Sequence, residues 1–469
     1  MEELTREELI AIIHKQNKII AELTAKIAEL AAKIAELEAR LKQNSSNSSK
    51  PPSTDGLKRP AVRSLRGKSG KKPGGQNGHK GHGLKQTREP DKTVIVNPVE
   101  CPRCEAGLLN EPVFHADTRY VYDVEIEMTL TKYDMMEAIC PVCGAAVVGM
   151  PPEECKGTIN YGNSLRAMSV VLTNYANVGI DKTHKILHDL LGVPISAGTV
   201  KTIMRQFAAK TNDAIAGIKG RLLKSRVLNV DETGIRAAGR TQWIHVASNS
   251  NYTLVSVHKK RGKEGTESGG VLGKYAGIAV HDCWKPYFGF EECKHALCCA
   301  HLLRELNALT ECGQSWASAM KTLLLDMKGA VDRYKTADKT ELSRYYREKF
   351  KARYDTVLAK AKEEIGPGTT RKKTKAENLL MRLEEYRTEI NRFTDDFDVP
   401  FDNNQAERDI RNVKVKQKVS GGFRTDDGAD DFAKTSSIIG TAVKLGQSVL
   451  GSIHDLLDGR QFSFNLATE

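Results

Sequence analysis

The sequence predicts a multidomain α/β protein with an N-terminal coiled coil, a zinc ribbon, a helical region and a mixed sheet. The chain has 469 residues and is 40% hydrophobic, which is enough for two to four domains with buried cores. Strand-like apolar runs gather between residues 226 and 300, and helical patterns surround them. A long heptad repeat and two C-x2-C pairs precede these runs.

The positive charge of the chain is concentrated in one segment. The formal net charge is +12, and residues 46–92 contain twelve Lys or Arg against three Asp or Glu, which leaves +9 in this segment alone. Such a block indicates a polyanionic partner such as nucleic acid. No run of eighteen apolar residues is present, and the N-terminus, MEELTREEL, is too polar for a signal peptide. A cytoplasmic protein without a membrane span is therefore expected.

Residues 1–42 predict a coiled coil that drives self-association into a homodimer or a larger homo-oligomer. Apolar residues follow one another at heptad spacing, with mostly Ile at one core position and mostly Leu at the other: Leu9, Ile13, Ile20, Leu23, Ile27, Leu30, Ile34, Leu37 and Leu41. Gln16 is the one polar residue in this series and can fix the register. This choice of core residues favours two parallel strands. An amphipathic helix packed on its own chain is the alternative, which the unbroken heptad period disfavours.

Residues 43–92 predict a flexible basic linker, because their Ser, Asn, Pro and Gly residues cannot build a core. The linker carries clustered cations, including Lys71 and Lys72. A segment that only solvates and separates its neighbours and an arm that contacts DNA both fit this composition. The two roles are compatible with each other.

Residues 93–155 predict a zinc-binding ribbon. The expected ligands are two C-x2-C pairs, Cys101 with Cys104 and Cys140 with Cys143. Each pair forms a knuckle that presents two thiolates to one ion, and two knuckles complete the tetrahedral coordination of structural Zn²⁺. Between the pairs, VYDVEIEMTLTKYDM alternates apolar and polar residues as a half-buried strand or hairpin does. Four unrelated core cysteines are the alternative, and the spacing argues against it.

Residues 156–225 predict short helices with the pattern of a DNA-binding helix-turn-helix. A Gly- and Pro-containing turn ends at Ser196, which is expected to cap an amphipathic helix. This helix carries Lys201 and Arg205, which are candidate DNA contacts. Many helical hairpins share this pattern, so a pair of helices without a role in DNA binding is the alternative.

Residues 226–300 predict the first part of a mixed α/β sheet. Strands are expected in RVLNVDETGI, QWIHVASN, YTLVSVH and GIAVHDCWKPY, and HALCCAHLLREL is expected to begin as a strand and become a helix. A turn is expected in GKEGTESGG and a helix near residues 271–275. Residues 301–395 predict a helical insertion. Residues 396–469 complete the core with a helix that opens at NNQAERDIR and a last helix over residues 436–457.

Asp231, Asp282 and Glu407 form the candidate catalytic set. Each aspartate is expected to end a short apolar strand, where carboxylates of neighbouring strands can converge on one edge of a sheet. Glu407 lies in the first turn of a helix that Asn403 and Asn404 can cap. Three carboxylates suit Mg²⁺ or Mn²⁺, and two such ions support phosphoryl transfer. The alternatives are turn-forming aspartates and, for Glu407, a solvated ion pair.

Neighbouring groups receive other roles. Glu232 and Asp409 adjoin the chosen carboxylates in the sequence and are expected to point elsewhere. Cys298 and His301 form a C-x2-H pair, for which packing and a local hydrogen bond are preferred over metal ligation. His281 precedes the second aspartate and is expected either to orient substrate or to cap the strand end, with neither role favoured.

Several motifs stand in order over most of the chain: NSSKPPS at 47–53, GKKPGGQNGHKGH at 70–82, the two C-x2-C knuckles, VDETG at 230–234, HDCWKPY at 281–287, CCAHLLREL at 298–306, DNNQAERDIR at 402–411 and SGGFRT at 420–425. With these motifs the chain resembles the transposases of the IS-66 insertion-sequence family. The resemblance implies an RNase H-like core in which Asp231, Asp282 and Glu407 are the DDE triad. It also implies that residues 96–150 are a zinc-binding domain.

The resemblance implies a DNA transposase that binds the ends of an insertion sequence. Metal-bound water would free a 3′-hydroxyl at the element end, and this hydroxyl would then attack target DNA. Phosphate contacts are expected from Arg408, Arg411, Lys414, Lys416 and, as a further candidate, Arg424. The implied partner is double-stranded DNA in a bacterial cytoplasm, near the nucleoid, and companion proteins from the same element are allowed.

Two other functions remain open from the sequence. One is an RNase H-like nuclease that cleaves strands without transferring them. The other is a non-catalytic, zinc-containing regulator that binds DNA, and the presence of all three acidic residues argues against it. The sequence does not name the terminal repeat, the target preference or the size of the assembly.

Overall fold

The computed structural model describes residues 6–41, 88–124, 126–152, 155, 157–366 and 373–467. Its contacts divide the chain into two compact units, of which one is residues 63–132 and the other is the remainder. Most of the predicted basic linker, including Lys71 and Lys72, lies outside the described residues. Among the helices that the structure describes, none combines the length and the apolar character needed to cross a bilayer.

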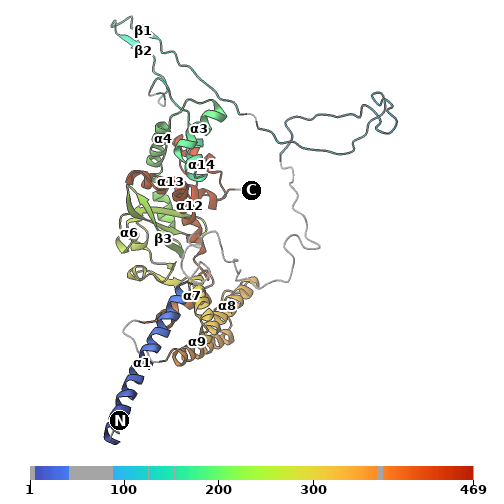
Figure 1. Ribbon diagram of the computed structural model, residues 1–469. Coiled ribbons are helices and arrows are strands. Elements are labelled where there is room, and N and C mark those ends of the chain that lie inside the picture. Colours follow the sequence, from blue (N-terminus) through green and yellow to red (C-terminus); the bar gives the residue numbers. More distant parts are fainter. Residues whose placement is uncertain are drawn as a thin grey trace, which may run out of the picture. The chain divides into compact units, whose positions relative to one another are not determined.

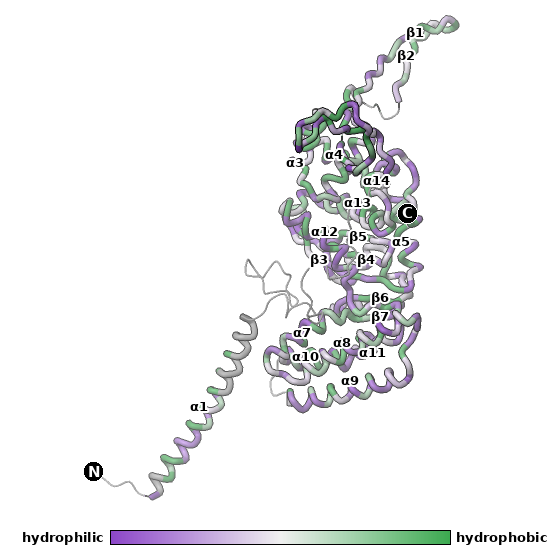
Figure 2. Tube along the Cα trace, turned by 90° about the vertical axis from the view of Figure 1, so that its right-hand side faces the viewer, coloured by the Kyte–Doolittle hydropathy of each residue, from purple (hydrophilic) through white to green (hydrophobic). Residues whose placement is uncertain are grey.

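The N-terminal helix α1 (Arg6–Leu41) has the extent that the heptad repeat predicts. Where Figure 2 colours α1, both hydrophobic and hydrophilic residues lie along it. On this single chain its described Ile and Leu core positions are exposed, among them Ile13, Leu23 and Ile27. An exposed apolar seam of this kind suits pairing with another helix.

The segment around the cysteine pairs contains little regular structure. Strands β1 (Glu137–Ile139) and β2 (Ala146–Val148) pair antiparallel on either side of the second knuckle. The strand or hairpin predicted for VYDVEIEMTLTKYDM is wrong, because the described residues of this segment form no strand. Its apolar side chains, such as Val121 and Leu130, are exposed, so their alternation marks no buried face.

A five-stranded mixed sheet carries the candidate site. Its strands are β3 (Val227–Ala237), β4 (Arg240–Ser248), β5 (Thr253–His258), β6 (Ile278–His281) and β7 (Lys294–Leu297). Their order is β5-β4-β3-β6-β7, with antiparallel pairing from β5 to β3 and parallel pairing from β3 to β7. The predicted mixed sheet is confirmed, and each strand lies where an apolar run predicts it.

Two local predictions around the sheet are wrong. The segment GKEGTESGG forms helix α6 (Lys263–Ser268) rather than a turn, because most of its glycines stand just outside the helix ends. The helix predicted near residues 271–275 is only a short 3₁₀ segment, η3 (Leu272–Lys274). Similarly, the single last helix is two helices, α13 (Asp426–Lys444) and α14 (Val449–Leu457), separated at Gly446, which has a positive φ of 70°.

Helices from the C-terminal part cover the face of the sheet that carries the candidate residues. Helix α12 (Asn404–Ser420) packs with the start of α13 against β3, β4 and β5, and Figure 1 shows these red helices beside the yellow-green strands. Helix α13 also runs along the edge strand β5. There the backbone N–H groups of Val255 and Thr253 donate to the hydroxyls of Ser437 and Thr441 at 2.8 and 3.1 Å. These bonds occupy part of an otherwise open strand edge.

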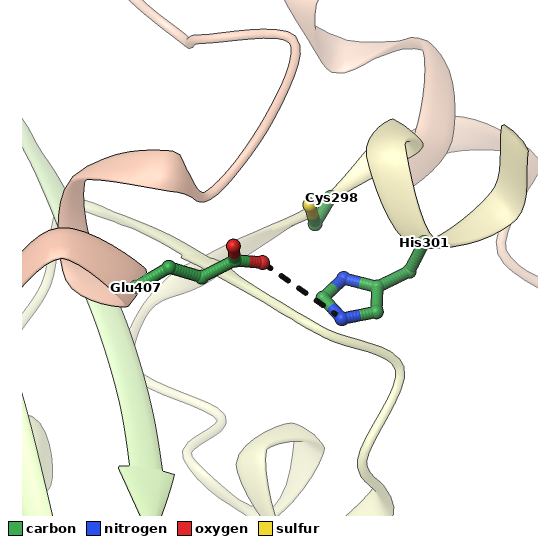
Figure 3. A group of neighbouring side chains, drawn as sticks. All are labelled: Cys298, His301 and Glu407. Atoms are coloured by element: carbon green, nitrogen blue, oxygen red, sulfur yellow. Dashed lines mark ion pairs between the residues drawn. The ribbon is translucent and has the colours of Figure 1, made fainter. Parts of the chain in front are cut away.

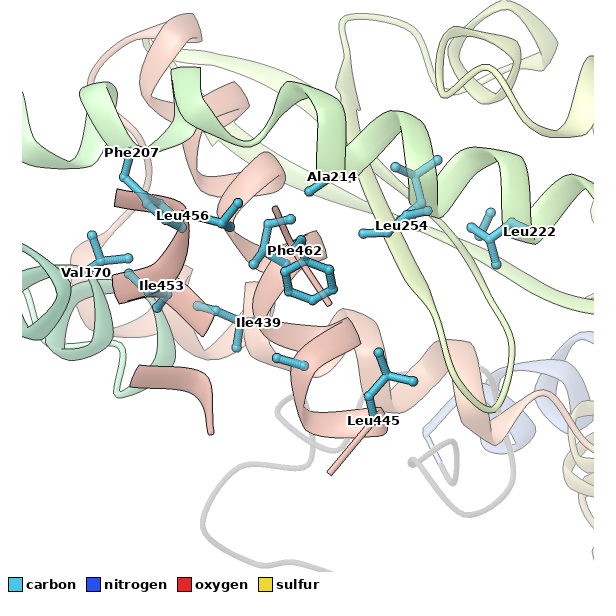
Figure 4. Close-up of a cluster of buried hydrophobic side chains, with 14 of the residues drawn as sticks. Val170, Phe207, Ala214, Leu222, Leu254, Ile439, Leu445, Ile453, Leu456 and Phe462 are labelled. Atoms are coloured by element: carbon cyan, nitrogen blue, oxygen red, sulfur yellow. The ribbon is translucent and has the colours of Figure 1, made fainter. Parts of the chain in front are cut away.

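The helical region before the sheet shares one hydrophobic core with it. This region comprises α2 (Asn163–Val170), the π-helical turn η2 (Val171–Tyr175), α3 (Ile180–Leu191), α4 (Ala197–Lys210) and α5 (Asn212–Leu223). Its buried side chains, such as Phe207 and Leu222, pack with residues of β5, α13 and α14 (Figure 4). The predicted cap is confirmed, because Ser196 accepts a hydrogen bond from the Thr199 N–H at 3.1 Å.

The predicted helical insertion is confirmed between the sheet and α12. It consists of α7 (Cys299–Glu311), α8 (Ser315–Thr336), α9 (Arg344–Ile365), α10 (Lys375–Glu385) and α11 (Arg387–Asp395). These helices have their own hydrophobic core around Trp316, which continues onto strands β6 and β7. The insertion therefore rests on the parallel side of the sheet and returns the chain to α12.

Candidate active site

Asp231 lies within strand β3 and does not end it, contrary to the prediction. Strand β3 continues to Ala237, paired with β4, whereas its parallel pairing with β6 stops at Asn229. Strand β3 extends beyond the end of its parallel neighbour β6 because its antiparallel neighbour β4 is longer and continues to pair with it. Asp231 therefore stands just past the point where the parallel side of β3 loses its partner.

Asp282 directly follows strand β6, as predicted. The register pairs Asn229 with Val280, so Asp231 and Asp282 both lie two residues beyond this pair. Carboxyl ends of parallel strands meet at the same edge of a sheet, which places the two aspartates in one region. The Asp282 Oδ1 atom accepts a hydrogen bond from the Trp284 N–H at 3.0 Å, and this bond fixes the turn after β6.

Glu407 enters the same region from the first turn of α12. The predicted side-chain cap by Asn403 is absent, since this side chain makes no hydrogen bond to the helix start. The Asn403 amide is instead buried and ties the helix to β3, accepting from the Asn229 side chain at 2.9 Å and donating to the Val230 carbonyl at 2.8 Å. This role of Asn403 was not predicted from the sequence, although two consecutive asparagines stand at the start of α12.

Burial and neighbouring carboxylates raise the pKa of both aspartates of the site. Burial, followed by the negative charges of Glu232, Asp282 and Glu407, raises the pKa of Asp231 to about 8. Burial and the charge of Glu232 raise the pKa of Asp282 to about 6. Like charges that share a poorly solvated region disfavour ionisation. A bound divalent cation would offset this repulsion, so the donor set fits Mg²⁺ or Mn²⁺.

Of the two competing carboxylates, Glu232 does not point away from the aspartates as expected, because its negative charge is the first charge that raises the pKa of both Asp231 and Asp282. Glu232 accepts hydrogen bonds from the Arg261 guanidinium at 2.7 Å and from the Tyr287 hydroxyl at 2.5 Å. Asp409 accepts from the Lys444 ammonium at 2.8 Å. Asp409 is thus paired with α13, whereas Glu232 is a buried neighbour of both aspartates that Arg261 and Tyr287 hold in place.

Cys298 and His301 lie against Glu407 and are not merely packing residues. Among the described residues, the ligand atoms of these three side chains all lie within 4.8 Å of one another. Within the described residues, the carboxylate oxygens of Asp231, Asp282 and Glu407 do not all lie within 4.8 Å of one another. Nε2 of His301 lies 3.9 Å from Glu407, an acidic residue of another helix.

His281 is a core residue. Its ring is fully buried against Tyr287 and Phe288, and one ring nitrogen lies 3.1 Å from a ring nitrogen of His295. Burial lowers the pKa of His281 to about 3, so the imidazole is neutral. Of the two roles left open for it, orienting substrate is therefore ruled out by burial.

The candidate phosphate contacts differ in exposure. Arg408, Arg411 and Lys414 are exposed on α12, and Arg424 is exposed after its C-terminus. Lys416 is buried instead, and its ammonium donates to the carbonyls of Thr173 at 2.7 Å and Val178 at 3.2 Å. This burial contradicts the predicted phosphate contact, because residues of the helical region before the sheet cover the Lys416 side chain.

The other predicted DNA contacts, Lys201 and Arg205, are exposed on helix α4. They lie one turn apart on the helix that follows the capped turn. Their exposure leaves both side chains free of the hydrophobic core, as a DNA contact requires.

The two cysteine knuckles have the same local geometry. In the first, the backbone N–H of Cys101 donates to Ala106 and the N–H of Glu105 donates back to the Cys101 carbonyl, both at 2.9 Å. In the second, Cys140 and Gly144 repeat these bonds at 2.8 and 2.9 Å. Backbone N–H groups directed at Cys101 and Cys140 lower the pKa of both thiols. Each knuckle is thus shaped to present thiolates, while the two knuckles belong to different compact units.

Comparison with known proteins identifies the family. A family model described as Transposase IS66 family matches residues 158–431, more than half of the chain, and this range includes Asp231, Asp282 and Glu407. A second model, described as a family of unknown function (DUF6444), matches residues 2–85. The comparison with curated proteins gives no match. The family resemblance expected from the motifs is confirmed, and the chain belongs to the IS66 family of transposases.

Proposed function

We propose that this chain is the transposase of an insertion sequence, which binds the element ends and catalyses strand cleavage and strand transfer. The observation that supports this most is that Asp282 and Glu407 both lie close enough to Asp231 to raise its pKa, in a chain of this family. The strand order β5-β4-β3-β6-β7, antiparallel and then parallel, supports an RNase H-like core. The region that holds the cluster lies at the carboxyl end of β6, where such a sheet places a site.

Asp231, Asp282 and Glu407 would hold the catalytic Mg²⁺ or Mn²⁺. When bound, these ions activate an attacking water or hydroxyl and stabilise the leaving oxygen in phosphoryl transfer. The chain supplies the rigid frame: β3 and β6 fix the aspartates, and Asn403 ties the start of α12 to β3. The exposed cations Arg408, Arg411 and Lys414 on the same helix would orient the phosphates of the DNA.

An assay with labelled element-end DNA, target DNA and Mg²⁺ tests this function. The expected products are a cleaved 3′ end and its joined product in target DNA. Cleavage without joining would indicate the nuclease, and binding without either would indicate the non-catalytic regulator. Matching inverted repeats and a short target duplication in the DNA around the gene would support the transposase independently.

We also propose that α1 pairs with α1 of another copy and makes the active protein a homodimer or a larger oligomer. The exposed seam of Ile13, Leu23 and Ile27 supports this proposal. Companion proteins of the same element remain possible partners of the assembled protein. A molecular mass measured on the full chain by light scattering would separate a monomer from an oligomer.

Lys414 and Lys416 are expected to respond differently to substitution, although they lie two residues apart. Lys414→Gln should weaken DNA binding at every sequence and reduce the slope of log affinity against log salt by about 1, since one phosphate contact is lost. Lys416→Gln should leave this slope unchanged and lower the free energy of unfolding by about 1–3 kcal/mol, because two buried carbonyls lose their donor. Salt-dependent binding and urea denaturation measure the two effects. Equal salt slopes for the two variants would contradict this assignment.

The four knuckle cysteines are expected to share one zinc ion. Cys140→Ser should remove one zinc equivalent per chain, and Cys101→Ser should remove the same one, so that the double variant loses no more than either single variant. The reason is that Zn²⁺ in a structural site needs four ligands. Elemental analysis of purified protein measures the content, with the exposed Cys312→Ser as control. Additive losses from the two single variants would show that the knuckles bind separate ions.

A further inference from the structure

We propose that Cys298, His301 and Glu407 form a second metal site, for Zn²⁺, which is separate from the cysteine knuckles and shares Glu407 with the proposed catalytic set. The ligand atoms of the three side chains lie within 4.8 Å of one another, the spacing of donors around one ion. Figure 3 shows the thiol, the imidazole and the carboxylate turned toward a common space from different elements.

The fold brings these residues together from two parts of the chain. Cys298 stands between β7 and α7 as the residue that caps the helix, and His301 follows in its first turn. Glu407 comes from the first turn of α12. The Asn403 N–H donates to the Cys298 sulfur at 3.1 Å, so the start of α12 is fastened directly to the thiol beside which Glu407 must lie.

Two of the donor atoms have no hydrogen-bond partner in the described part of the chain. They are Nδ1 of His301 and Oε1 of Glu407, and both are buried. The Arg304 guanidinium lies 3.7 Å from this oxygen and Nε2 of His301 lies 3.9 Å from it, both beyond hydrogen-bond length. Buried polar atoms are almost always satisfied, so unpaired atoms on two neighbouring side chains of one cluster support a bound ion here.

The thiol is placed to become a metal-bound thiolate. Backbone N–H groups of Asn403, His301 and Ala300 direct their hydrogens at the Cys298 sulfur, an arrangement that also suits a metal-bound thiolate. Binding of Zn²⁺ would displace the thiol proton to solvent and leave the N–H groups bonded to a coordinated sulfur.

The donor chemistry selects the ion. Sulfur, nitrogen and one carboxylate oxygen are the usual ligands of Zn²⁺, whereas Mg²⁺ prefers oxygen alone. Three protein ligands leave a fourth position open. Cys298 and His301 line a cavity of about 210 Å³ that also reaches Asp282, Trp284 and Arg382, so there is room for a water or a phosphate oxygen at this position.

Glu407 belongs to this site and to the proposed catalytic set. Zinc bound at this site would therefore fix the position of a proposed catalytic residue. This consequence for catalysis rests on the proposed function. The site itself does not depend on that function, because metal binding is measured without DNA or turnover. Loss of one proposal in experiment would leave the other standing.

Metal content of the full-length protein tests the site. Cys298→Ser and His301→Asn are each expected to remove one zinc equivalent per chain, in the native background and again in the Cys140→Ser background. Cys312→Ser is the matched control and should remove none. Equal zinc content in the native protein and in both site variants would overturn the proposal, whatever the knuckles bind.

A spectroscopic readout covers the case in which a variant folds poorly. Co²⁺ added to the Cys140→Ser protein should give a thiolate-to-cobalt charge-transfer absorption with the intensity of a single sulfur ligand. Cys298→Ser should abolish this band, while His301→Asn should shift the visible bands of the bound cobalt. A spectrum that neither substitution changes, or a bound cobalt without thiolate character, would overturn the assignment.

Discussion

Asp231→Asn is expected to reduce Mg²⁺-dependent cleavage of element-end DNA by at least about 10³-fold. The substitution replaces an anionic oxygen donor with a neutral amide at nearly the same shape, so metal affinity falls while packing is kept. Loss of metal-based charge stabilisation of several kcal/mol corresponds to a rate loss of this size. Asp282→Asn and Glu407→Gln should have similar effects, because all three groups would hold the same ions.

Single-turnover cleavage and DNA binding should be measured together for these variants. DNA affinity should change far less than the cleavage rate, since the exposed cations, and not the carboxylates, are the proposed phosphate contacts. The control is Asp430→Asn, which alters an exposed carboxylate on α13 that pairs with Lys434. If the three carboxylate variants all cleave and join at the native rate, the catalytic assignment is wrong.

Asp409→Ala is expected to lower the free energy of unfolding by about 3–5 kcal/mol. Asp409 on α12 and Lys444 on α13 form an ion pair at 2.8 Å in which both side chains are only 10% exposed. Lys444 also donates to the carbonyls of Asn249 at 2.9 Å and Tyr252 at 3.3 Å. Removing the carboxylate leaves a buried ammonium without its counter-charge, and charge burial without a partner is costly.

Urea denaturation of matched variants measures this loss. Asp430→Ala removes one member of an exposed pair at i,i+4 spacing and should cost less than about 0.5 kcal/mol. The double variant Asp409→Leu with Lys444→Met should recover part of the loss, because no unpaired charge remains. A loss below about 1 kcal/mol for Asp409→Ala would mean that this pair does not hold α12 on the sheet.

Much of the fold could be predicted from the sequence because it depends on local signals. The strands of the sheet, the insertion helices, the cap at Ser196 and the extent of α1 all follow from apolar period and helix-end chemistry. The extent of β3 could not be predicted from the sequence, since the continuation of this strand past Asp231 depends on the length of its neighbour β4. The alternation of apolar and polar residues between the cysteine pairs wrongly predicted a strand. Such a period of two produces a strand only where a partner strand and a buried face exist.

The sequence by itself determined the family, the candidate carboxylates and the cysteine knuckles, since residue type and spacing carry this information. Only the tertiary structure decided which side chains meet. It placed Asn403 as a tie to β3, buried Lys416 among backbone carbonyls, and brought Cys298 and His301 to Glu407. These contacts join segments distant in the chain, and they depend on how helices pack on the sheet, which no local pattern encodes.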